Sequence, residues 1–441
     1  MMFTNKQLKQ LIVPLIIEQL LSVTVGMADS VMIASVGESA VSGVSLVDTV
    51  MVLLINIFAA LATGGAVVAG QYIGQKRAER SCKAAEQLVL FTTVLSIIIT
   101  AVVYLGQGLI LHGVFGQIEA DVMGHAETYL VIVTASIPFI ALYNSGAALF
   151  RAMGNSKVSM KTSLLMNAIN ITGNAILIFG LKMGVAGAAI PTLISRIVAA
   201  VIMILLLART NQEIHLPRPF SIKFDRHMVR KILHIGIPNG LENSMFQLGK
   251  ILVLSLVAGF GTASIAANAV SNTIAMFQIL PGMAIGFAIL TVVSQCVGAG
   301  DYDQAKYYTK KLMKIVYVAM WGMNVIIFLL LPLIMKVYNL SDVTAQMTTQ
   351  ILTYHAICCC TIWPMSFSLP NTLRASNDVR LTMIISILSM WIFRIAFSYV
   401  LGKFLGWGVF GVWVAMTIDW LFRGICFMVR YARGKWQYQK I

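Results

Sequence analysis

Two acidic side chains, Glu18 and Asp29, interrupt the first long apolar stretch of the sequence. They are eleven residues apart, so on a helix with 100° per residue they lie only about 20° apart around the axis. Asp29 is roughly 8 Å from the far end of that stretch, whereas Glu18 lies in the half nearer the N-terminus. An ionised carboxylate in an apolar segment is costly unless it serves a function, so both residues are functional candidates.

A polar stripe runs along a later apolar stretch and consists of Ser163, Asn167, Asn170 and Asn174, spaced four, three and four residues apart. The next stretch has Ala188 and Thr192 in its first two turns. We expect Asp29, Asn170, Asn174 and Thr192 to meet at one depth. Carboxylate, amide and hydroxyl oxygens would hold a sodium ion, or the carboxyl would take a proton instead. The alternative is that these groups only form hydrogen bonds between helices.

The amino-acid composition indicates that the apolar stretches that carry these residues are membrane-spanning helices. Of the 441 residues, 58% are hydrophobic and 11% are charged, and the mean hydropathy is +0.84. A soluble domain has about 25% charged residues, so the sequence is that of an all-α integral membrane protein. Twelve spans are predicted, at roughly 11–34, 46–72, 88–112, 126–150, 160–181, 187–208, 231–258, 266–297, 312–335, 345–370, 381–402 and 408–430.

The net charge of +15 follows the connections between these spans. On the twelve-span plan 25 of the 32 Lys and Arg residues fall on one side, whereas the opposite loops hold only Lys182, Lys336 and Lys403. This asymmetry is the positive-inside pattern, so we expect both termini to be cytoplasmic in a bacterial plasma membrane. The charge therefore reflects topology, and no nucleic-acid partner is expected.

The chain also repeats itself at a lag of 224 residues. Pro14 matches Pro238, Glu18 matches Glu242, and the Gln71 and Gly74 pair matches Gln295 and Gly298. The lag slips to 223 at Arg151 and Arg374 and then returns to 224 at Gly184 and Gly408. We predict a six-helix half at 1–210, a cytoplasmic linker at 211–230 and a second half at 231–441. The pseudo-twofold axis of the halves would run along the membrane normal, with the substrate cavity between them.

The second half has its own charged residues within the spans. Asp419 and Arg423 are four residues apart on one helical face, and a structural ion pair is the simplest interpretation. Glu242 has no such local partner, and as the repeat mate of Glu18 it would attract cationic substrate. We therefore take Glu18, Glu242, Arg394 and Asp419 as candidate residues of a substrate cavity. No catalytic residue is assigned. Cys and His residues show no zinc pattern, so no metal site is expected.

Six short segments together resemble the multidrug and toxin extrusion (MATE) family of transporters, in particular its bacterial DNA-damage-inducible F group. They are Met27–Met32, Gly37–Ala40, Gln71–Gly74, Leu149–Asn155, Gly236–Glu242 and Leu373–Asp378. The resemblance implies a monomeric, V-shaped antiporter that exports amphipathic, cationic organic compounds in exchange for H⁺ or Na⁺. It also implies that Asp29, Asn170, Ala188 and Thr192 bind the coupling ion. Asn174 stands where many relatives have an aspartate, which leaves the identity of the ion open.

Two other functions were considered. A flippase for a lipid-linked oligosaccharide, or a metabolite exporter of the same superfamily, would have a more basic interior than the five acids and four bases found within the spans. A membrane-embedded enzyme would need a catalytic motif, and the sequence contains no HExxH, GxSxG or Walker A segment. Secondary transport is therefore the preferred interpretation.

Overall fold

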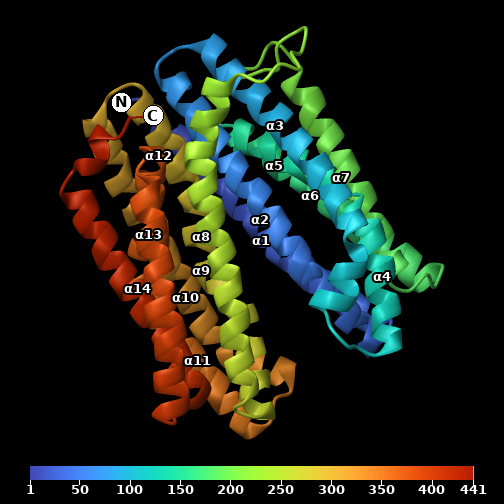
Figure 1. Ribbon diagram of the computed structural model, residues 1–441. Helices are drawn as coiled ribbons and strands as arrows, with labels where there is room; N and C mark the ends of the chain where they lie inside the picture. The colour runs from blue at the N-terminus through green and yellow to red at the C-terminus, as the bar shows by residue number, and fades with distance from the viewer. Residues whose placement is uncertain (441) are drawn as a thin grey trace. The chain divides into compact units, whose positions relative to one another are not determined.

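A computed structural model describes residues 1–440 as an assembly of helices, with no strand in that range. The chain divides into two compact units, which we call the first unit (residues 9–240) and the second unit (residues 1–8 together with the chain from Leu241 onward). Both chain ends belong to the second unit and lie at the same end of it (Figure 1). The predicted division at a linker of residues 211–230 stays a prediction.

The first unit contains most of α1 (Asn5–Ala34) and the start of α8 (Arg226–Ala258), with the helices between them. These are α2 (Glu38–Gly74), α3 (Ala78–Leu105), α4 (Ala120–Thr134), α5 (Ile137–Ala152), α6 (Ser156–Asn174) and α7 (Ala186–Leu207), with π-helical segments η1 (Leu109–Val114) and η2 (Ala175–Gly180).

The second unit continues from α8 through α9 (Thr262–Gly298), α10 (Tyr302–Tyr338), α11 (Asp342–Thr361), α12 (Pro370–Ala375), α13 (Val379–Ser389) and α14 (Gly408–Ala432). Its π-helical segments are η3 (Pro364–Ser368), η4 (Met390–Ala396) and η5 (Tyr399–Phe404), and a 3₁₀ turn, η6 (Lys435–Tyr438), follows α14.

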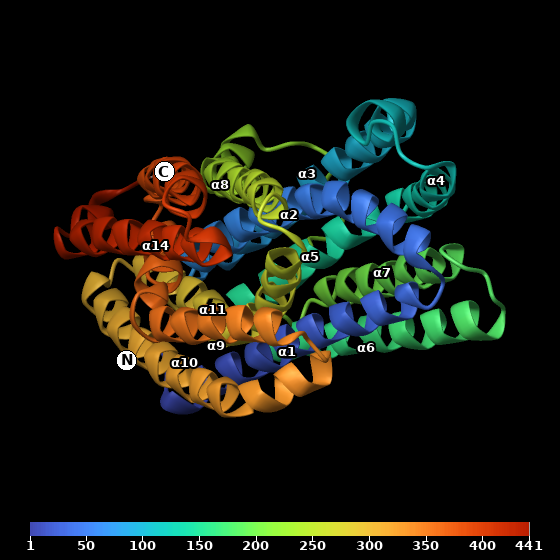
Figure 2. The same ribbon diagram turned by 90° about the horizontal axis from the view of Figure 1, so that it is seen from below.

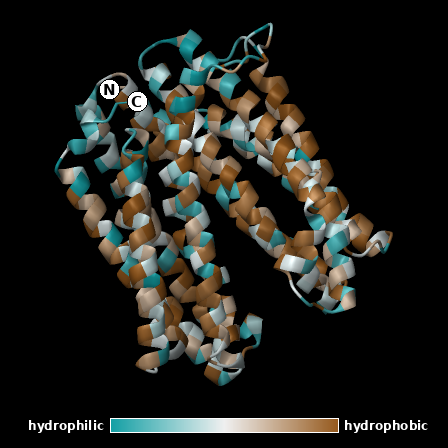
Figure 3. Cartoon of the chain, in the orientation of Figure 1, coloured by the Kyte–Doolittle hydropathy of each residue, from teal (hydrophilic) through white to brown (hydrophobic). Residues whose placement is uncertain are grey.

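Each of the twelve predicted spans falls on helix within the described residues. Ten are single stretches long and apolar enough to cross a bilayer, and an eleventh is the pair α4 and α5, bent by 50° where they meet. The twelfth, at 345–370, comprises α11, η3 and α12. Figure 3 shows apolar residues along the helices and hydrophilic residues mainly in the connecting loops. An all-α membrane protein is the fold that the sequence predicted.

The repeat is visible in the secondary structure. Helices α2 and α9 both have 37 residues and begin 224 positions apart, and η2 and η5 are related by the same lag. Each long helix follows a glycine with positive φ, Gly37 at 146° and Gly261 at 104°. Because residues with a Cβ rarely adopt such angles, glycine marks the same turn in both halves.

The connection before α8 is held against α3 by two side chains. Buried Gln87 accepts a hydrogen bond from the Asp225 N–H at 2.9 Å and donates one to the Lys223 carbonyl at 3.0 Å. Glu86 accepts one from the Ser221 N–H at 2.7 Å. This part of the predicted linker is therefore packed on the first unit.

Replacing Gln87 with Leu would leave two backbone groups of this connection without partners. Each such hydrogen bond is worth about 1 kcal/mol, so we expect trypsin to cut at Lys223 roughly tenfold faster than in the unchanged protein. Gln107→Leu is the control, because the Gln107 amide oxygen has no hydrogen-bond partner. Equal cleavage rates in the two variants would contradict the tethering role of Gln87.

Candidate functional site

The five predicted coupling residues lie in one chain of hydrogen bonds in the first unit. The Asn174 amide donates to Asp29 Oδ1 of α1 and, at 3.3 Å, to Asn170 Oδ1. Asn170 in turn donates to Thr192 Oγ1 at 3.0 Å, and the Thr192 hydroxyl donates to the Ala188 carbonyl at 3.0 Å. The structure thus brings together residues of α1, α6 and α7, and Figure 2 shows these three helices as ribbons.

Burial differs along this chain. Asn174 is fully buried, Asn170 and Thr192 are almost so, and Asp29 is half-buried. Asn174 Oδ1 is buried without a hydrogen-bond partner. An unsatisfied amide oxygen beside a carboxylate is unfavourable by itself, and it fits a group that supplies positive charge or a donated proton.

The close approach of α6 and α7 brings the amides to Thr192. A Cβ added to Gly173 would lie 2.7 Å from the Pro191 Cβ, so only glycine allows this contact without displacement. Gly173 precedes Asn174, and Pro191 precedes Thr192, so the contact sits beside the hydrogen bonds. The π-helical segment η2 begins directly after Asn174, as π-bulges often do near functional residues.

Three further residues that we had not assigned to the site surround Asp29. Asp48 on α2 and Arg196 on α7 act electrostatically on Asp29. Tyr129 donates to Asp48 at 3.1 Å, and Arg196 donates to Ser136 Oγ at 2.8 Å. With two carboxylates and one guanidinium the cluster has one surplus negative charge. The signal in the sequence was Asp48 itself, an acid within an apolar span.

The two repeat-related glutamates each form an ion pair with a repeat-related arginine. Glu18 lies 3.6 Å from Arg151, and Glu242 lies 2.8 Å from Arg374. Both carboxylates are largely buried, and Glu18 also accepts a hydrogen bond from Ser159 at 2.9 Å. Glu242 has no partner on its own helix, and the arginine that pairs with it is 132 positions away in the sequence. Attraction of substrate by either glutamate stays a prediction.

Asp419 and Arg423 of α14 form the expected ion pair at 3.2 Å, and both are buried. Arg394, in η4, is buried too. These residues belong to the second unit, as does Glu242, whereas Glu18 and the coupling residues belong to the first. Among the described residues no group of three or more His, Cys, Asp and Glu side chains is close enough to hold a metal ion.

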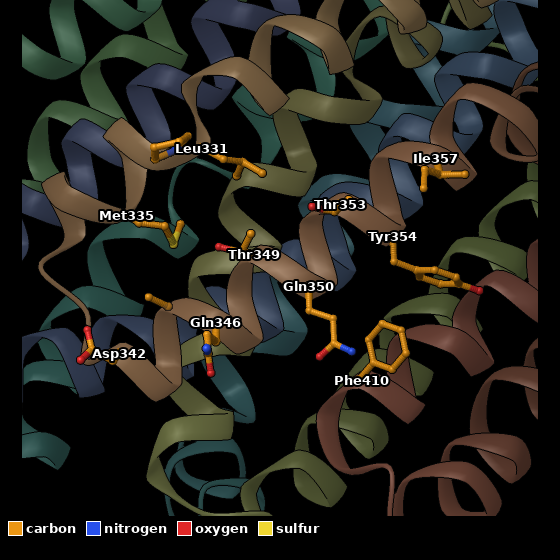
Figure 4. A pocket seen from close by; sticks show the side chains of 12 residues that line it. Leu331, Met335, Asp342, Gln346, Thr349, Gln350, Thr353, Tyr354, Ile357 and Phe410 are labelled. Atoms are coloured by element: carbon orange, nitrogen blue, oxygen red, sulfur yellow. The ribbon is translucent and has the colours of Figure 1, made fainter.

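The second unit also has a groove of about 990 Å³ between α10, α11 and the start of α14. Figure 4 shows that Gln346, Thr349, Gln350 and Tyr354 line it from one face of α11. None of the predicted site residues lines this groove.

Duplicated halves of apolar helices long enough to span a membrane are the plan of many transporter folds. The sequence profile of the MatE family matches residues 14–176 and 238–400, two segments related by the lag of 224. The chain therefore belongs to the MatE family of transporters.

Relatives agree with this assignment. The chain is 29% identical to the uncharacterized transporter YisQ of Bacillus subtilis over 435 residues, covering 96% of this chain and 93% of YisQ. It is 26% identical over 418 residues to the probable multidrug resistance protein YoeA of the same organism, covering 91% and 88% of the two chains. A solved outward-facing multidrug resistance MATE transporter has the same fold, with a TM-score of 0.92 at 20% identity over 98% of this chain and 97% of that one.

Substituting alanine for Gly173 tests the positioning of the site. The added Cβ would push α6 away from α7, and overpacking of this kind costs about 1–3 kcal/mol. We expect a lower melting temperature in detergent. Gly180→Ala is the matched control, because a Cβ there meets nothing within 4 Å and the change should be neutral or stabilising. A Gly173→Ala protein as stable as the control would refute the close-contact argument.

The ion pair of Glu242 and Arg374 supports a second prediction. Arg374→Met would leave a largely buried carboxylate unpaired, which costs about 3–5 kcal/mol, so the melting temperature should fall. Adding Glu242→Gln to that variant removes the uncompensated charge and should restore part of the loss. If the double variant melts no higher than Arg374→Met, the glutamate is not the source of the instability.

Proposed function

We propose that the protein is a secondary antiporter that exports amphipathic, cationic organic compounds in exchange for Na⁺ or H⁺, with Asp29 as the carboxylate that binds the coupling ion. The observation that carries this proposal is the unsatisfied, buried Asn174 oxygen next to Asp29. The surplus negative charge around Asp29 supports it, because a cation would neutralise that charge.

The same geometry offers a place to either ion. A sodium ion would take oxygen ligands from Asp29, Asn174 and Asn170, with the Thr192 hydroxyl and the Ala188 carbonyl next along the chain. A proton on Asp29 would convert the carboxylate from acceptor to donor, and the carboxyl could then bond to the free Asn174 oxygen. Either event changes the link between α1 and the α6–α7 pair.

Binding of this kind supplies a switch in the first unit. The ion makes different contacts before and after the Asp29–Asn174 hydrogen bond is rearranged, so it favours one arrangement of α1 over the other. We propose that this rearrangement releases the substrate outside.

We further propose that Glu18, Glu242, Arg394 and Asp419 lie along the substrate path, with the two glutamates changing partners when substrate arrives. Membership of the DNA-damage-inducible F group, a monomeric state, and a location in a bacterial plasma membrane with both termini in the cytoplasm complete the proposal. The relatives named as multidrug resistance proteins support its substrate class.

Reconstitution in liposomes loaded with a fluorescent cationic dye tests the mechanism. We expect an imposed H⁺ or Na⁺ gradient to drive dye movement in the unchanged protein and Asp29→Asn to reduce it to the leak rate, because the variant lacks the charge that binds the ion. Asp121→Asn, at an exposed aspartate of the same unit, is the control and should transport normally.

Full gradient-driven transport by Asp29→Asn would show that Asp29 is not the coupling group. If neither gradient moves dye in the unchanged protein, the proposed antiport of organic cations is wrong.

A further inference from the structure

Apart from the ion pair of Glu242 and Arg374, the charge balance within the predicted spans of the second unit is opposite to that of the first. Lys250 on α8, Arg394 in η4 and Arg423 on α14 outnumber one carboxylate, Asp419. Asp419 is already engaged, by Arg423 at 3.2 Å and by the Ser389 hydroxyl at 2.5 Å. Within residues 1–440 no carboxylate forms a salt bridge with Lys250 or Arg394. The three cations therefore exceed this carboxylate by two charges.

Of the two cations Lys250 and Arg394, the arginine is the more buried and has the greater need of a hydrogen-bond acceptor. Its side chain is 7% exposed, and its Nη1 atom is buried without a hydrogen-bond partner. A buried guanidinium is strongly disfavoured unless an anion or a set of acceptors satisfies it. The position thus has a buried donor that none of the residues 1–440 satisfies.

An aromatic ring joins Arg394 to Lys250. The Arg394 guanidinium lies 4.6 Å from the centre of the Phe246 ring, and the Lys250 ammonium lies 5.2 Å from it. Lys250 is exposed, so this cation also has access from outside the unit. Both cations are about eight residues from the far ends of their spans, roughly 12 Å in, which puts them at one depth.

A second ring extends the apolar part of the cluster. Phe367 packs edge-to-face on Phe246 at 6.4 Å and stacks with Trp363 at 5.0 Å. The Arg423 guanidinium lies over the Phe367 ring, 4.9 Å from its centre. Cations and flat apolar surfaces therefore occur side by side.

The internal repeat sharpens the contrast. At the lag of 224, Arg394 corresponds to Asn170 of the coupling site, and Lys250 corresponds to Gly26, one turn before Asp29. The second unit thus has two cations where the first has an amide and no charge, while the acid Asp29 corresponds to Val253. At these corresponding positions the second half of the repeat has basic residues, and the first half has an acid.

We propose that Lys250 and Arg394 bind the carboxylate or phosphate group of an amphipathic organic solute, with its aromatic body against Phe246 and Phe367. The site would admit organic anions and zwitterions. The positive group of a zwitterion would also agree with the cationic substrates of the proposed antiport. The inference rests on the proposed transport of amphipathic compounds for the nature of its ligand, but it does not depend on the coupling ion.

Calorimetric titration of the purified full-length protein in an uncharged detergent tests this site with 1-naphthoate as the probe. We expect saturable binding that weakens at least about tenfold in Lys250→Met and in Arg394→Met, the effect of losing one charge-assisted hydrogen bond. The matched amine, 1-naphthylmethylammonium, should not bind more weakly to these variants. Lys403→Met, at an exposed lysine of the same unit, is the control and should retain wild-type affinity.

Unchanged 1-naphthoate affinity in Lys250→Met and Arg394→Met, or no binding to the unchanged protein, would overturn the proposal. Because Lys250 is exposed, its variant keeps the test valid even if Arg394→Met fails to fold. A second arm uses nanodiscs. Equal binding with phosphatidylcholine alone and with added phosphatidylglycerol supports a soluble ligand, whereas abolition by phosphatidylglycerol would assign the site to lipid headgroups and overturn the proposal.

These measurements need no ion gradient. Failure of 1-naphthoate to bind would leave the antiport mechanism standing, and full transport by Asp29→Asn would leave the basic site standing. The two proposals can therefore fail separately.

Discussion

The buried Asn174 amide makes the hydrogen bonds that link the predicted coupling residues of the first unit. Its two N–H groups are used by Asp29 and Asn170, so the amide connects α1 to α6, and Asn170 carries the connection to α7. Its oxygen remains unsatisfied in a place closed to water. A site with one unmet acceptor beside a carboxylate has two ways to gain stability, through a cation or through a proton. The close contact of Gly173 with Pro191 fixes the positions of the two asparagine amides at the place where the cation or the proton would bind.

Duplication explains why two units of similar construction have different electrostatics. The helix lengths, the glycine turns and the glutamate–arginine pairs repeat. In both halves the arginine neutralises a largely buried glutamate. The residues in the outer parts of the spans do not repeat. Asp29 and the asparagines occupy one copy, and Lys250 and Arg394 occupy the other. We propose that the first unit binds a small cation and that the second binds an anionic group of the solute.

Much of the fold was predictable from sequence. The length of each apolar stretch, and the distribution of Lys and Arg between the loops, can be read from residues that are adjacent along the chain. The grouping of Asp29, Asn170, Asn174 and Thr192 followed from helical depth alone. The ion pairs of Glu18 and Glu242 did not, because their partners lie more than a hundred positions away and depend on tertiary packing. The bend between α4 and α5 and the π-helical segments were also missed, since neither leaves a periodic signal. Arg394 was recognised as an interior charge, but only the structure shows that its Nη1 atom lacks a partner.

In the proposed mechanism the free Asn174 oxygen and the Asp29 carboxylate together bind a cation. Sodium titration of purified Asn174→Asp and of the unchanged protein tests it most directly, because the substitution replaces that amide by a second carboxylate at the same position. We expect Asn174→Asp to bind sodium at least about tenfold more tightly, because an added negative charge near a bound ion strengthens binding. Adding Asp29→Asn should reverse the gain. Sodium binding that is indifferent to both substitutions would contradict it.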